Sequence, residues 1–199
     1  ERLLAWFAEN LDEWQPKFSP LPTGYVFANS GAPLDRVVMN GIALSDRKQS
    51  MRCAHRIREG GQWALRSRVS ALCRTDWRAF STVFDRELRL GAFMAQVRAH
   101  PFVLCVEGGG LDPSPKAWLT LALGSIPIIR RSPTAAAYED ALPVAVVDRW
   151  DASVLDRERL RHWCDTFSSW VTCAAHRQEL EYRLSLDYWW NRIIACYRQ

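Results

Sequence analysis

The stretch that decides the fold is HPFVLCVEGGGLDPSPKAWLTLALGSIPII, from His100 to Ile129. It contains two short apolar runs, PFVLCV and SIPII, and a third run of the same kind, PVAVV, starts at Pro143. Runs rich in Val and Ile with no polar alternation are typical of strands buried on both faces, and such strands belong to parallel sheets. The three runs therefore predict neighbouring strands of one parallel sheet.

Helices are predicted between these strands. Ser114 is a good N-cap, and Pro115 suits the first helical position, where the amide hydrogen has no partner within the helix. Gly124 supplies the C-terminal stop of this helix. Residues Thr134 to Ala141 predict a second, shorter helix. The alternation of strands and helices predicts the α/β class, with a Rossmann-like parallel sheet and flanking helices.

The remaining chain is organised around this unit. Apolar residues between Leu3 and Trp14 follow a nearly helical spacing, which predicts an N-terminal helix ended by Pro16. We assign residues 1–23 to this helix and a proline-rich linker, which leads into a short strand, and residues 24–199 to the Rossmann-like lobe. The other expected elements are strands over residues 36–44 and 50–57 and helices over residues 62–74, 86–99, 156–170 and 175–199, the last two being long C-terminal helices.

Composition excludes several classes of protein. Of the 199 residues, 48% are hydrophobic and 24% are charged, and no run approaches the ~20 apolar residues of a membrane span, so we expect no span in this chain. The net charge is +4, but the Arg residues are mixed with acids and form no basic block, so we expect no nucleic-acid partner. The six Cys and four His lack metal-ligand spacing, so we expect no metal site; a Cys164–Cys173 pair is left open.

A glycine-rich loop lies where a ligand is expected. In open α/β sheets, ligands bind beyond the carboxyl ends of the strands. Here Gly108, Gly109 and Gly110 follow the first strand, and glycine permits positive φ angles and a close approach of a ligand to the backbone. The following helix N-terminus, with Lys116 in its first turn, suits a phosphate. The spacing is neither a dinucleotide fingerprint nor a P-loop, so a turn without a ligand is the alternative.

A second cluster, Arg130, Arg131 and Ser132, follows the next strand. Two guanidinium groups and a hydroxyl at the carboxyl end of a strand suit a diphosphate, and an exposed turn is the alternative. Asp112 and Glu139 could accept hydrogen bonds from ribose or sugar hydroxyls, although each alone is more often a surface acid.

A series of short motifs fills the region from Pro101 to Asp148: GGGLD, KAW, LGSIPII, RRSP, YEDALPV and VVD. In this series the chain resembles the C-terminal half of exostosin-type and related glycosyltransferases, and PLPTGYVF resembles the segment that links the two lobes of that family. The resemblance implies the C-terminal lobe of a GT-B fold and a nucleotide-sugar donor held between the loop and residues 130–132. It also implies a glycan or protein acceptor, no cofactor besides the donor substrate, and a Golgi or secretory location.

The donor-binding residues expected from the pattern and the resemblance are Gly108, Gly109, Gly110, Asp112, Ser114, Lys116, Arg130, Arg131, Ser132 and Glu139. No catalytic residue is assigned, because the resemblance places the acceptor site and the general base in an upstream lobe. The chain begins at Glu1 without Met, so we expect it to be part of a longer protein that contains that lobe.

Two departures from the family pattern support an alternative function. Pro113 to Lys116 replaces the His-Arg pair that commonly follows the loop Asp in the family, and Leu119 stands where the family has an acid after the Trp. A lobe that has lost this acid is either a donor site with the role moved to Asp112 or Glu107, or a degenerate, non-catalytic binding or interaction module.

Overall fold

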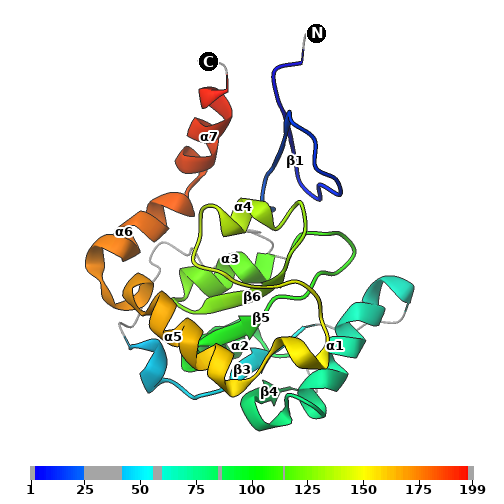
Figure 1. Ribbon diagram of the computed structural model, residues 1–199. Coiled ribbons are helices and arrows are strands. Elements are labelled where there is room, and N and C mark those ends of the chain that lie inside the picture. The colour runs from blue at the N-terminus through cyan, green and yellow to red at the C-terminus, as the bar shows by residue number, and fades with distance from the viewer. Residues whose placement is uncertain (1–2, 25–41, 56–59, 85–86, 114, 197–199) are drawn as a thin grey trace.

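A five-stranded parallel sheet forms the centre of the molecule (Figure 1). The computed structural model describes residues 3–24, 42–55, 60–84, 87–113 and 115–196. The strand order is β4–β3–β5–β6–β7, and every neighbouring pair is parallel. The strands are β3 (Met51–Cys53), β4 (Ser81–Val83), β5 (Phe102–Leu104), β6 (Ile126–Arg130) and β7 (Ala145–Val147). The predicted α/β class with a parallel sheet is thereby confirmed, and the topology is compatible with a Rossmann-like fold.

Helices cover both faces of this sheet, which is why strands β5, β6 and β7 are mainly apolar. The helices are α1 (Ala64–Arg74), α2 (Leu90–Ala99), α3 (Pro115–Ala122), α4 (Ala136–Glu139), α5 (Arg157–Thr172), α6 (Ala174–Arg183) and α7 (Leu186–Ala195). Phe102 and Leu104 of β5 pack in one core with α1 and α5. Val103, between them, packs in the second core with α2 and α3.

A short strand and several 3-10 turns complete the fold, and the periodicity of the sequence does not indicate them. Strand β4 was not expected, because three half-buried residues at a sheet edge show no recognisable period. Single 3-10 turns occur at Leu44–Asp46, Gly61–Trp63, Arg78–Phe80 and Ala152–Val154. The helices expected over residues 62–74 and 86–99 begin later, at Ala64 and Leu90.

The prediction of an N-terminal helix is wrong. Strand β1 (Trp6–Ala8) lies in the middle of the expected helix and pairs in parallel with β2 (Phe18–Pro20). The centroids of the Trp6 and Phe18 rings lie 6.3 Å apart, and Asn10 has a left-handed backbone with φ of 53°. The segment instead reaches the lobe, where Thr134 donates a hydrogen bond to the Leu11 carbonyl at 2.9 Å. Contacts with the lobe override a helical propensity that is weak in itself.

The single long helix expected over residues 175–199 is two helices, α6 and α7. Ser185 has an extended backbone, and its hydroxyl accepts the hydrogen bond of the Tyr188 amide, so it acts as the N-cap of α7. The Trp189 indole donates to the Arg183 carbonyl at 2.9 Å, which satisfies a group at the end of α6. The break brings Trp189 against Trp118 of α3, with 6.1 Å between ring centroids.

Three further expectations from the sequence concern two short strands, a cysteine pair and the absence of a membrane span. The short strand expected at the end of the linker and most of the one expected over residues 36–44 lie outside the described residues. Cys164 and Cys173 are both free thiols, so the pair left open above is not made. Among the described residues, no helix combines the length and the apolar character needed to cross a membrane.

Gly124 lies between α3 and β6, and its substitution tests whether this position requires glycine. Its φ of 74° lies in the left-handed region, and its amide donates to the Leu121 carbonyl at 2.9 Å. We expect Gly124→Ala to lower the free energy of unfolding by about 1–2 kcal/mol, measured by urea denaturation. The control is Gly91→Ala in α2, where an added Cβ meets open space and no positive φ is required; this change should leave stability unchanged or raise it. Equal stability of both variants would contradict the assignment.

Candidate functional site

The glycine-rich loop lies at the carboxyl edge of the sheet, between β5 and α3, and is approached by the protein's own side chains. A Cβ on Gly108 would lie 2.7 Å from Nη2 of Arg66 in α1, and one on Gly110 would clash with Oδ1 of Asn10. The left-handed glycines of the described chain are elsewhere. Gly108 and Gly110 therefore permit a close approach by side chains of the protein itself, and the loop glycines do not use positive φ. The expected approach of a ligand stays a prediction.

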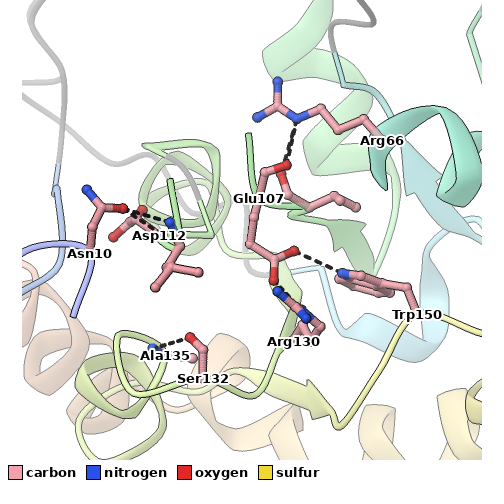
Figure 2. A network of polar contacts seen from close by, with 10 residues as sticks. Asn10, Arg66, Glu107, Asp112, Arg130, Ser132, Ala135 and Trp150 are labelled. Atoms are coloured by element: carbon pink, nitrogen blue, oxygen red, sulfur yellow. Dashed lines mark hydrogen bonds and ion pairs between the residues drawn. The ribbon is translucent and has the colours of Figure 1, made fainter. Parts of the chain in front are cut away.

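Asn10 binds the loop amides that were expected to receive a phosphate. Its Oδ1 accepts hydrogen bonds from the amides of Leu111 at 2.8 Å and Asp112 at 3.1 Å (Figure 2). The left-handed backbone at Asn10 is a conformation that Asn tolerates better than most residues. This part of the loop is thus held by the N-terminal segment.

Asp112 is a buried tie between the loop and two other segments. Its carboxylate accepts hydrogen bonds from the Tyr138 hydroxyl at 3.0 Å and from the Thr23 amide at 3.1 Å. Burial and the Asp112 charge both raise the pKa of Tyr138, so the phenol keeps its proton and acts as the donor. The structure therefore gives Asp112 a positioning role between α4 and the N-terminal segment.

Glu107 is a second buried acid of the site. Its carboxylate is almost fully buried and accepts hydrogen bonds from Nε of Arg130 at 2.5 Å and from the Trp150 indole at 2.9 Å (Figure 2). Arg66 donates to its backbone carbonyl at 3.1 Å. A buried carboxylate needs this number of charged and polar partners to offset its lost hydration. Glu107 thus joins the ends of β5 and β6 to the chain beyond β7.

Lys116 adds a second enclosed cation beside the loop. The residue as a whole is half-buried, but its Nζ atom is shielded from solvent. The pKa of this ammonium is lowered to about 8: burial is the main cause, the charges of Arg66 and Arg52 also lower it, and Cys105 and Cys53 raise it. The charges of Arg52 on β3 and Arg66 on α1 therefore both act on Lys116 of α3.

Some of the other expected donor-binding residues lie close to the loop, and others make contacts elsewhere. Arg131 pairs with Glu139 at 2.6 Å and with Asp148 at 2.9 Å, so its contacts are with these acids and not with the loop. The Ser132 hydroxyl accepts the hydrogen bond of the Ala135 amide at 3.0 Å, next to α4 (Figure 2). Ser114 lies outside the described residues. Lys116 and Arg130 are thus the expected cations found close to the loop.

Sequence reasoning missed residues that now define the site: Asn10, Arg52, Arg66 and Trp150. Asn10 lies in a segment with helical periodicity, and Arg66 lies on an ordinary helix, so neither position carries a motif. Arg52 carried one overlooked signal, a charged residue in the centre of a short strand. Among the described residues, no group of three or more His, Cys, Asp or Glu is arranged to hold a metal ion.

The Glu107 network predicts a stability effect. We expect Glu107→Gln to lower the free energy of unfolding by about 2 kcal/mol in urea denaturation, because the Arg130 cation loses a buried anionic partner. Glu139→Gln is the matched control: Arg131, its partner, is 56% exposed, so the loss should stay below about 1 kcal/mol. Equal losses in the two variants would show that Glu107 is no more than a surface acid.

The lowered pKa of Lys116 predicts that the free energy of unfolding changes with pH in the opposite direction to that expected for a lysine in an ordinary ion pair. Its folded pKa of about 8 lies below the ordinary 10.5, so its charge destabilises the folded state below pH 8, and this penalty disappears as pH rises from 8 to 10.5. Lys116→Met should therefore raise the free energy of unfolding at pH 7 by up to about 3 kcal/mol.

The difference between Lys116→Met and the unchanged protein should shrink steadily across this pH window in urea denaturation. Lys48→Met, at an exposed position, is expected to alter stability by less than about 0.5 kcal/mol at pH 7. A constant Lys116→Met difference from pH 7 to 10.5 would contradict the enclosed ammonium.

Comparison with known proteins assigns no family to the chain. No protein-family model matches it, and the curated proteins include no significant relative. The resemblance to exostosin-type glycosyltransferases therefore depends on the motifs between Pro101 and Asp148, and its functional consequences are proposals.

Proposed function

We propose that this chain is the donor-binding lobe of a glycosyltransferase and binds a nucleotide-sugar at the carboxyl edge of its sheet. The observation that carries the proposal is the gathering of Arg66, Lys116 and Arg130 around the loop between β5 and α3. Cations at this edge of a parallel sheet suit the diphosphate of a sugar nucleotide. The motif resemblance supports a sugar nucleotide over other phosphate compounds and supports a GT-B arrangement.

Side chains, not loop amides, are the expected phosphate contacts. The amides of Leu111 and Asp112 already bind Asn10. Arg130, in contrast, contacts Glu107 through Nε, and its side chain is 33% exposed. Its two Nη groups form no hydrogen bond with the described residues and can make the paired hydrogen bonds that guanidinium makes with phosphate.

These cations suggest how the lobe contributes to transfer. Breaking the bond between the anomeric carbon and the diphosphate oxygen builds negative charge on the leaving diphosphate. Lys116 and Arg130 would stabilise that charge through preorganised electrostatics. An upstream lobe would bind the glycan or protein acceptor and supply the base that removes the proton of its hydroxyl.

A degenerate, non-catalytic module is the second candidate. Leu119, in the place of the family's acid, packs against the second hydrophobic core. Glu107, to which the missing role was open, is already bound by Arg130 and Trp150, and Asp112 by Tyr138 and Thr23. Neither carboxylate is thus free of protein contacts, which favours a lobe that binds without catalysing transfer.

Calorimetric titration with a panel of nucleoside diphosphates tests donor binding. We expect at least one of them to bind, and the double change Lys116→Ala/Arg130→Ala to weaken it by roughly 100-fold, since each charged contact contributes about 1.5 kcal/mol or more. Arg131→Ala is the matched control, because this adjacent arginine contacts Glu139 and Asp148.

Two results would overturn the donor site. One is that no nucleoside diphosphate binds the folded protein. The other is that Arg131→Ala and the double variant lose affinity equally, which would indicate non-specific attraction to positive charge. Binding that survives in the double variant together with intact partner binding would favour the non-catalytic module.

A further inference from the structure

Arg52 is an unusual residue for the centre of a sheet. It lies on β3 between Met51 and Cys53, and its side chain is fully buried. Nε, Nη1 and Nη2 of Arg52 all lack a hydrogen-bond partner among the described residues. In Arg98 and Arg177, by comparison, only Nε is in this condition. Burial without hydrogen bonds is costly for a charged group, so the position calls for an explanation.

The guanidinium of Arg52 points toward the carboxyl edge of the sheet. Arg52 pairs in register with Thr82 of β4, and Phe84 follows two residues later, on the same face. The central carbon of the guanidinium lies 3.3 Å from the centroid of the Phe84 ring. The side chain therefore extends from mid-strand toward the edge that carries the glycine-rich loop.

The charges around Arg52 are complementary to an anion. Burial lowers the pKa of Arg52 only to about 10, so the group is positive at neutral pH. Its charge acts on Lys116, as does the charge of Arg66. Like charges enclosed together repel, and an oxyanion bound beside Arg52 and Lys116 would relieve this repulsion and would supply the hydrogen bonds that the Arg52 guanidinium lacks.

The residue that covers Arg52 is partly exposed to solvent. Phe84 stacks on the guanidinium but is itself only half-buried. A partly exposed aromatic ring at the end of β4 thus lies over the cation. Rotation of a single side chain is a fast motion compared with rearrangement of a helix or strand.

We infer that Arg52 and Lys116 form a buried oxyanion site at the carboxyl ends of β3 and β5, which receives one phosphoryl group of a diphosphate. The inference rests on the proposed function for the identity of that diphosphate as part of a nucleotide-sugar. Arg52 is then a phosphate-binding residue in addition to those expected from the motifs. Arg130 would contact the other phosphoryl group.

Inorganic pyrophosphate is the probe that tests this site without a nucleotide. In a thermal unfolding experiment, pyrophosphate at about 100 times its Kd should raise Tm by roughly 5 °C over sodium chloride of equal ionic strength. Arg52→Met replaces the guanidinium with an apolar chain that can pack on Phe84. It should raise Tm in the absence of anions and weaken pyrophosphate at least about tenfold.

Arg98→Met is the matched control. It removes an arginine with a buried, unbonded Nε from the last turn of α2, which precedes the amino end of β5, and should leave pyrophosphate affinity within about twofold. Unchanged affinity in Arg52→Met overturns the site, and so does the absence of any Tm rise with pyrophosphate in the unchanged protein. The second criterion needs no variant and holds even if Arg52→Met does not fold.

A nucleoside diphosphate titration separates this inference from the proposed function. If pyrophosphate binds through Arg52 but no nucleoside diphosphate binds more tightly, the oxyanion site stands and the donor function fails. If a nucleoside diphosphate binds and Arg52→Met leaves its affinity unchanged, the donor function stands and the Arg52 site is wrong.

Discussion

The buried carboxylate of Glu107 is the interaction on which the carboxyl edge of this sheet depends. It accepts hydrogen bonds from Arg130 at the end of β6 and from Trp150 beyond β7, and Arg66 of α1 donates to its backbone carbonyl. Four segments distant in sequence are thereby held at one point. Burying a carboxylate is costly unless its oxygens accept hydrogen bonds, so the geometry of its donors is tightly constrained.

This constraint determines what the edge can do chemically. Arg130 is fixed by the carboxylate of Glu107 and Arg66 by its backbone carbonyl, which places positive groups beside the loop between β5 and α3, where Lys116 is also enclosed. Enclosed cations bind anions more strongly than exposed ones, because there is less water to screen them. Asn10, in contrast, binds the loop amides of Leu111 and Asp112. The resulting site would bind phosphate through side chains and not through a helix terminus.

The parts of the fold that could be predicted are those whose sequence pattern lies within one short segment. The strands at Phe102–Leu104 and Ile126–Arg130 and the helix that starts at Pro115 follow from apolar runs and capping residues, which are local. The N-terminal segment was misread because the contact of Asn10 with Leu111 spans 101 residues and leaves no local pattern. Strand β1 likewise exists only through its pairing with β2.

The same distinction holds within the candidate site. Lys116 and Arg130 were found because they follow strands or glycines in the sequence. Arg131 was grouped with Arg130 for the same reason, yet its contacts are with Glu139 and Asp148. Arg66 and Trp150 reach the site through tertiary packing, so no spacing in the sequence could have indicated them.

A crystal structure of the protein with a bound nucleoside diphosphate would test the central claim most directly. The account predicts phosphate oxygens within hydrogen-bond distance of Nζ of Lys116 and of the Nη groups of Arg130, with Glu107 still bound to Nε of Arg130. A diphosphate bound elsewhere on the protein, with Lys116 and Arg130 uncontacted, would contradict it.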